Sequence, residues 1–178
     1  NASAALLDKP DLTPEKQVEL TRMIREESAR VSSLVQDFLQ ISRYRKPKFA
    51  LIDPAVPMER ALATALAGRD NVRVEKSLQH DGAHILADPG LLQQAWSNIF
   101  TNAIQAMGEN GGALRVETHL EHGMISLAVE DSGPGISPDI MPGLFEPFFT
   151  TKDEGTGLGL SIANTLTDAN GGRLEVQT

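Results

Sequence analysis

The sequence predicts an α+β protein, in which a two-layer α/β sandwich over residues 49–178 follows a partial helical hairpin over residues 1–48. Three observations favour this class. Apolar residues before Pro47 recur about every 3.5 positions, as in a coiled coil. Helical and alternating segments interleave after Pro47. A long stretch rich in glycine and proline then precedes the last helix.

The first element is a helix that Thr13 caps and Pro14 opens. Its apolar seam steps by four and three, with Glu27 as the one interruption, through Leu20, Ile24, Val31, Leu34, Phe38 and Ile41. The helix should end near Arg45, before Pro47. Because the seam is narrow and needs a partner, we expect a dimerising hairpin whose other helix ends in residues 1–7. Packing onto its own domain is the alternative.

The remaining elements follow from periodicity and from their caps. In order, they are helix Pro54–Leu66, strand Val72–Leu78, helix Pro89–Met107, strands Ala113–Leu120 and Met124–Glu130, helix Leu158–Asn170 and closing strand Arg173–Gln177. The strands look antiparallel. Residues 131–156 form a loop long enough to be a functional lid.

Composition excludes several classes of function. The 178 residues carry a net charge of -8, so we expect no nucleic-acid partner. Without cysteine there is no disulfide or thiolate metal site. No apolar run approaches the roughly 20 residues that cross a bilayer, and the chain does not begin with a signal-peptide pattern. We therefore expect a soluble piece of protein.

Two amides stand on the helix that begins at Pro89. Asn98 and Asn102 are four residues apart and share one face. Their carbonyl oxygens are the hard ligands that Mg²⁺ takes while it bridges phosphate oxygens. Two hydrogen-bonded structural amides are the alternative.

Polar and glycine-rich segments surround the long loop. Asp131 directly follows a strand and can accept a hydrogen bond from an exocyclic amine, while Gly133 and Gly135 let the backbone approach a flat ligand. A simple turn is the alternative. An apolar cluster at Phe145–Phe149 should dock on the domain or on a partner, or form a satellite core beneath the loop.

The segment Gly155–Leu160 leads into the last helix and can present backbone N–H groups to phosphate. Its spacing is that of neither a P-loop nor a dinucleotide fingerprint. Lys152, just upstream, can reach a phosphate as a mobile charge. A solvent-exposed lysine is the alternative.

Taken in order, these motifs resemble those of the sensor histidine kinases, and the resemblance covers residues 45–178 strongly. The sequence of residues 145–160, together with Gln105-Ala106-Met107 after the two asparagines, looks most like that of the nitrogen-regulation branch. The matches are Asn98 and Asn102 to the N box, Asp131, Gly133 and Gly135 to the G1 box, Phe145–Phe149 to the F box, and Gly155, Gly157 and Gly159 to the G2 box.

The resemblance implies a Bergerat ATP-binding fold that uses ATP and Mg²⁺. Asp131 would bind the adenine amino group, and Asn102, helped by Asn98, would hold Mg²⁺ against the triphosphate. Asn102 and Lys152 are the catalytic candidates. The γ-phosphoryl group would pass to a histidine on a homodimeric hairpin, and then to an aspartate of a response-regulator receiver domain. The nucleotide-binding candidates are Asn98, Asn102, Asp131, Gly133, Gly135, Gly155, Thr156, Gly157, Leu158 and Gly159.

The chain departs from the family at both ends. Its four histidines, His80, His84, His119 and His122, all lie outside the hairpin, so the phosphoacceptor is expected upstream. His80-Asp81 has the acceptor dipeptide but reads as a loop. The family's last strand would follow Thr178. We expect a cytoplasmic fragment, with any anchor in the inner membrane supplied by upstream segments.

Two other functions remain open. One is an ATP-hydrolysing relative of the gyrase, chaperone and mismatch-repair superfamily, which usually carries a catalytic glutamate on the N-box helix. Here the nearby positions are Gln93, Gln94, Ser97 and Thr101, and no acid precedes Glu109. The other is a non-catalytic nucleotide-binding scaffold that docks a response regulator.

Overall fold

The computed structural model describes residues 13–42, 46–152 and 155–177. The chain divides into two units, Asn1–Tyr44 and Arg45–Thr178. The predicted boundary after residue 48 therefore lies four residues further along the chain than this division. None of the helices in the described ranges has the length and apolar character needed to cross a membrane.

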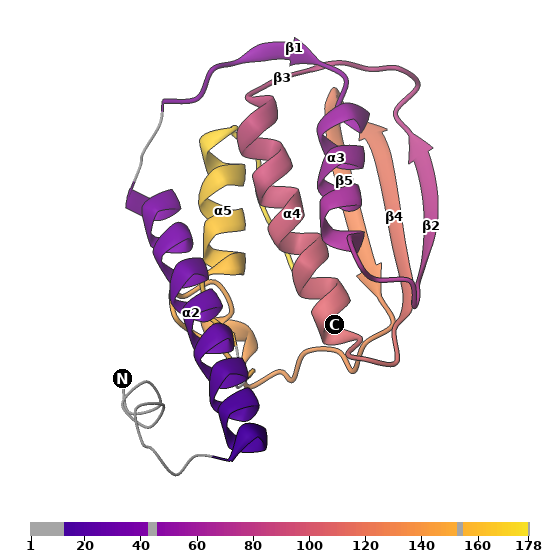
Figure 1. The fold of residues 1–178 in the computed structure, drawn as a ribbon. Helices are drawn as coiled ribbons and strands as arrows, with labels where there is room; N and C mark the ends of the chain where they lie inside the picture. Colours follow the sequence, from indigo (N-terminus) through magenta and orange to yellow (C-terminus); the bar gives the residue numbers. More distant parts are fainter. Residues whose placement is uncertain (1–12, 43–45, 153–154, 178) are drawn as a thin grey trace. The chain divides into compact units, whose positions relative to one another are not determined.

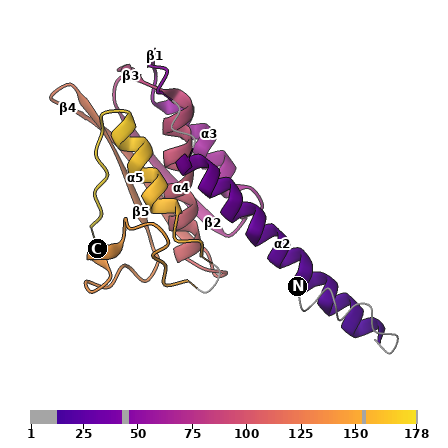
Figure 2. The same ribbon diagram turned by 90° about the vertical axis from the view of Figure 1, so that its left-hand side faces the viewer.

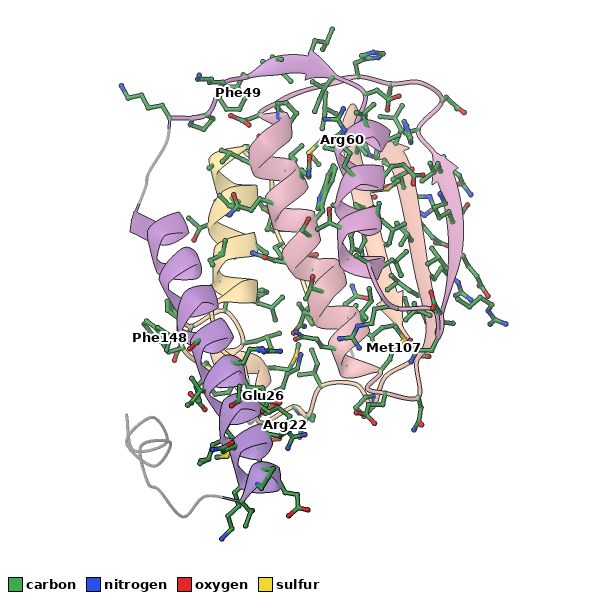
Figure 3. All side chains as sticks on the ribbon, in the orientation of Figure 1. Arg22, Glu26, Phe49, Arg60, Met107 and Phe148 are labelled. Atoms are coloured by element: carbon green, nitrogen blue, oxygen red, sulfur yellow. The ribbon has the colours of Figure 1, made fainter. Side chains whose placement is uncertain are left out.

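The first unit is described through one helix, α2, Pro14–Ser42. The hydroxyl of Thr13 accepts a long hydrogen bond from the Lys16 N–H at 3.5 Å, and Glu15 lies in the first turn, where the helix dipole favours a negative charge. Arg22 and Glu26 form an exposed ion pair at 3.7 Å on this helix (Figure 3). The predicted end near residue 45, the partner helix and turn over residues 1–12, and the seam side chains of Leu34, Phe38 and Ile41 lie outside the described residues.

A layer of three helices covers one face of the sheet in the second unit (Figures 1 and 2). They are α3, Ala55–Leu66; α4, Pro89–Ala106; and α5, Gly159–Ala169. Helix α4 lies in the middle, beside both of the others (Figure 1). It begins where predicted because the Asp88 carboxylate accepts hydrogen bonds from the first backbone N–H groups and Pro89 needs no such partner.

The sheet has the strand order β2-β4-β5, with bounds Val72–Gln79, Gly112–Glu121 and Met124–Asp131. Strands β4 and β5 are antiparallel, and they meet at a two-residue turn in which His122 and Gly123 have φ of 51° and 77°. Strands β2 and β4 are parallel, so the expectation of antiparallel strands is wrong for this pair. The reason is topological, because α4 carries the chain back across the sheet between them.

Two short strands escaped prediction and one predicted strand is absent. Strands β1, Ala50–Ile52, and β3, Ile85–Ala87, pair antiparallel and form a separate two-stranded sheet. Three residues are too few to show an alternating pattern. Residues 173–177 were expected to be a strand, but in the described part of the chain they form no strand.

The core lies between α3, α4 and β4, and it fixes the orientation of α4. Phe100, which is fully buried, and Ile104 point from α4 into this core. At 100° per residue, Asn98 and Asn102 lie on nearly the opposite side of the helix from Phe100. Packing of one face therefore presents the two amides on the other. The buried core residues are Met58, Ala61, Leu62, Phe100, Ala103, Ile104, Met107, Leu114 and Val116.

Candidate nucleotide and metal site

A row of three amides runs along the C-terminal half of α4. Asn98, Asn102 and Gln105 follow each other at spacings of four and three, so they share one face of the helix. The two asparagines are half-buried and Gln105 is exposed. The row ends at Gln105, two residues before Met107, the residue that caps the C-terminal end of α4 (Figure 3).

Asn98 has a buried donor that nothing satisfies among the described residues. Its Nδ2 is shielded from solvent and has no hydrogen-bond partner there. An unpaired buried amide group destabilises a fold by about 1–3 kcal/mol, which makes such groups rare outside functional sites. The simple alternative, a pair of satisfied structural amides, is therefore not what the structure has at Asn98.

Lys152 reaches this row from the long loop. Its Nζ donates to Asn102 Oδ1 at 3.0 Å and to Gln105 Oε1 at 3.1 Å. The loop positions it locally, because the Thr150 hydroxyl accepts the Lys152 N–H at 3.1 Å. Partial burial lowers the pKa of Lys152, and the negative charge of Asp131 acts in the opposite direction. The alternative of a freely exposed lysine is thus not observed.

Asp131 ends β5, opposite Leu114 of β4. Its Oδ1 accepts the Gly133 N–H at 2.9 Å, which folds the chain into a tight turn. A Cβ on Gly133 would lie 2.6 Å from that oxygen and 3.2 Å from the Ala106 carbonyl carbon of α4. A side chain at this position would therefore crowd both the Asp131 carboxylate and the end of α4. Gly135 follows in the same loop with φ of +75°.

The second glycine-rich segment is packed against the phenylalanine segment. Gly157 has φ of +67°, and a Cβ there would lie 2.5 Å from the carbonyl carbon of Phe148. Its carbonyl accepts the Phe148 N–H at 3.0 Å. Phe148 itself has a positive φ of 69° and is 65% exposed, so this ring is not part of a satellite core (Figure 3). A Cβ on Gly155 would contact Lys152 Cβ at 3.2 Å, which places this glycine beside the lysine.

The remaining residues of this segment position the start of α5. Leu158 is fully buried, and its N–H donates to the Thr156 hydroxyl at 3.4 Å. Gly159 opens α5, and a Cβ there would meet nothing within 4 Å. Glycine at 159 is thus not required by packing in this structure, unlike glycine at 157.

The structure accordingly brings Lys152 into contact with Asn102, although they are 50 residues apart in the sequence, and the charge of Asp131 acts on the same lysine. It also shows Gln105 as a partner of Lys152, for which the sequence analysis assigned no role. The spacing of three residues shows only that Gln105 shares one helix face with Asn102, and it gives no sign of the lysine.

The chemistry of these groups suits Mg²⁺. The Asn102 oxygen already accepts a hydrogen bond from a positively charged group, so it is oriented to face a cation. Amide oxygens are hard ligands, and Mg²⁺ typically needs only one or two from the protein, with water and phosphate oxygens as the rest. The residues present therefore fit the ion.

The sequence and the fold were compared with those of known proteins. Residues 87–178 match the family described as "Histidine kinase-, DNA gyrase B-, and HSP90-like ATPase". The sensor protein FixL of Bradyrhizobium diazoefficiens is 40% identical over 121 residues, which are 66% of this chain and 24% of FixL. The sensor histidine kinase ZraS of Escherichia coli K12 is 29% identical over 160 residues, which are 89% of this chain and 34% of ZraS.

Solved structures of kinases share the fold. Full-length ShkA in complex with AMPPNP has a TM-score of 0.70 and 27% identity, over 94% of this chain and 36% of ShkA. Histidine kinase ThkA in complex with the response regulator protein TrrA has a TM-score of 0.69 and 24% identity, over 96% of this chain and 48% of ThkA. The chain spans 24–34% of the length of FixL and ZraS.

Proposed function

We propose that this chain transfers the γ-phosphoryl group of ATP to a histidine. It belongs to the family of histidine kinase-, DNA gyrase B- and HSP90-like ATPases and is the ATP-binding catalytic part of a sensor histidine kinase. The observation that carries the proposal is the hydrogen bond from Lys152 to Asn102. This bond connects the long loop that carries Lys152 to the amide row of α4. The negative charge of Asp131 acts on the same lysine.

Each residue has a role in the proposed reaction. The Asp131 carboxylate accepts a hydrogen bond from the adenine amino group. Asn102, with Asn98 beside it, holds Mg²⁺, and the Lys152 ammonium approaches the phosphates. Mg²⁺ supplies neutralisation of charge on the phosphate oxygens. The chain thus binds, orients and neutralises, which is most of what catalysis of phosphoryl transfer needs.

The acceptor histidine is supplied by another segment. The four histidines of the chain lie in the second unit, and His80 is only 6% exposed. Its ring bonds the Thr118 hydroxyl at 2.9 Å and lies 3.4 Å from an Asp53 oxygen. A ring enclosed in this way has no access to a γ-phosphate, so His80-Asp81 is not a suitable acceptor.

The sequence of α4 disfavours a hydrolase. Between Pro89 and Ala106 the helix carries no acidic side chain, so it has no carboxylate to activate water. Transfer to a separate acceptor fits this helix better than rapid hydrolysis.

Partners belong to the same proposal. We expect a homodimer through the hairpin of which α2 is one helix, and a response regulator as the final acceptor. The structure of the histidine kinase ThkA in complex with the response regulator protein TrrA supports the second expectation. We also propose that a membrane anchor, if the whole protein has one, lies upstream.

The test is transfer in trans. The chain is mixed with a helical hairpin that carries a phosphoacceptor histidine from a related kinase and with ATP labelled at the γ-phosphate. We expect acid-labile label on the hairpin, and about 100-fold less with Asn102→Ala. Binding of ATP without label on any acceptor would support the scaffold function instead. Rapid release of labelled phosphate without an acceptor would support the ATPase.

A further inference from the structure

The contacts of Lys152 support a further inference, which rests on the proposed function. The ammonium occupies the oxygen that the metal is expected to use, since Nζ lies 3.0 Å from Asn102 Oδ1. Gln105 holds the same ammonium with a second bond of 3.1 Å. Gln105 has no place in the metal or nucleotide chemistry described above, and its side chain holds this lysine on the amide row.

A metal ion and the ammonium would interfere with each other on Asn102. Mg²⁺ binds oxygen at about 2.0–2.1 Å, so the two cations would be separated by at most roughly 5 Å. At that separation, in a partly buried site, like charges repel strongly. Binding of the metal should therefore displace the lysine from Asn102, and it should do so more easily when fewer bonds hold the lysine.

We propose that Lys152 is an internal competitor of Mg²⁺, held on Asn102 by Gln105 and displaced when Mg²⁺ arrives with ATP. Gln105 is then a positioning residue that sets the Mg²⁺ concentration at which the site fills. The displaced ammonium is then available to bind the phosphates that arrive with the metal. The Lys152 ammonium would thus bind the amide row when the metal is absent and the phosphates when the metal is present.

The test measures Mg²⁺ dependence and not turnover. ATP is titrated calorimetrically into the 178-residue chain at a series of Mg²⁺ concentrations. The quantity recorded is the Mg²⁺ midpoint, which is the Mg²⁺ concentration at which the increase in ATP affinity is half complete. Gln105→Leu keeps every charge of the site and removes one bond to Lys152. It should lower the midpoint about 3- to 10-fold. Lys152→Met should lower the midpoint further, and it should weaken ATP binding in EDTA because the phosphates lose a cation.

Gln93→Leu is the matched control. It makes the same substitution on the same helix, but residue 93 lies about 140° around α4 from Asn98. Its midpoint should equal that of the unchanged chain. If Gln105→Leu and Lys152→Met bind ATP with an unchanged Mg²⁺ midpoint, the competition does not exist. If the unchanged chain binds no ATP at any Mg²⁺ concentration, the proposed function fails and the competition fails with it.

Discussion

The two ends of α4 differ in how their polar groups are used. At the N-terminus the buried Asp88 carboxylate accepts three backbone N–H groups, from Gly90 at 2.9 Å, Leu91 at 3.1 Å and Lys48 at 2.7 Å. In the C-terminal half, Asn98 Nδ2 has no partner among the described residues and Asn102 is held by a lysine 50 residues away. One end therefore stabilises the fold, whereas the other keeps its groups for a ligand.

This comparison predicts that substitutions along α4 separate into two classes. Changes to the core face or to the first turn should lower the free energy of unfolding. Changes to the amide row should leave it nearly unchanged and weaken nucleotide binding. The predictions follow in order of their expected effect on the free energy of unfolding.

The largest loss is expected from Phe100→Ala. The ring is fully buried between α3, α4 and β4, and its removal leaves a cavity. The free energy of unfolding should fall by about 3–5 kcal/mol. Urea denaturation followed by circular dichroism measures it. A loss below about 1 kcal/mol would mean that the ring does not anchor α4.

Asp88→Ala should come second. The substitution removes the cap of α4 and leaves the Lys48 N–H without its acceptor. We expect a loss of about 2 kcal/mol or more, because helix caps and bonds to charged acceptors each contribute on this scale. Asp88→Asn, which keeps one acceptor oxygen, should lose less. Equal losses for the two variants would contradict the role given to the carboxylate.

Asn102→Ala should separate binding from stability. Its bond to Lys152 is partly exposed, so its loss should change the free energy of unfolding by less than about 1 kcal/mol. Affinity for ATP with Mg²⁺ should fall at least about tenfold. Denaturation and calorimetry on the same preparation measure both quantities. A destabilised protein with unchanged affinity would reverse the assignment of this end of the helix.

Asn98→Ala should have the smallest effect on stability. It should leave the free energy of unfolding unchanged or raise it slightly. The wild-type side chain has a buried Nδ2 without a partner, and its removal relieves that penalty. We expect a free energy of unfolding equal to that of the wild type, or up to about 1 kcal/mol higher, together with weaker binding of ATP and Mg²⁺. A loss of more than about 2 kcal/mol would show that Asn98 is a structural residue.

Local signals explain what could be predicted. The three helices of the second unit agree with prediction to within one residue at each end, because Asp88-Pro89 and the glycines mark their ends. The two-layer fold and the family were likewise predicted. The parallel β2–β4 pair, the short β1 and β3, and the lack of a strand at 173–177 depend on pairing across the fold, which local sequence does not encode.

The site shows the same division. Asn98, Asn102, Asp131 and Lys152 were identified from residue type and spacing, but their roles in binding stay predictions. The contact of Lys152 with Gln105 could not be predicted, because it joins residues 47 positions apart through the course of a long loop. Placement in the nitrogen-regulation branch also stays a prediction.

The most direct measurement is calorimetric titration of ATP, with and without Mg²⁺, into the chain and into Asp131→Asn. The substitution keeps an oxygen that can accept the Gly133 N–H, so the turn should persist. It replaces an acceptor with an amide that can present N–H to the adenine amine. We predict binding by the chain, strengthened by Mg²⁺, and a loss of at least about tenfold in the variant. Equal binding by both folded proteins, or none by the chain, would contradict the account.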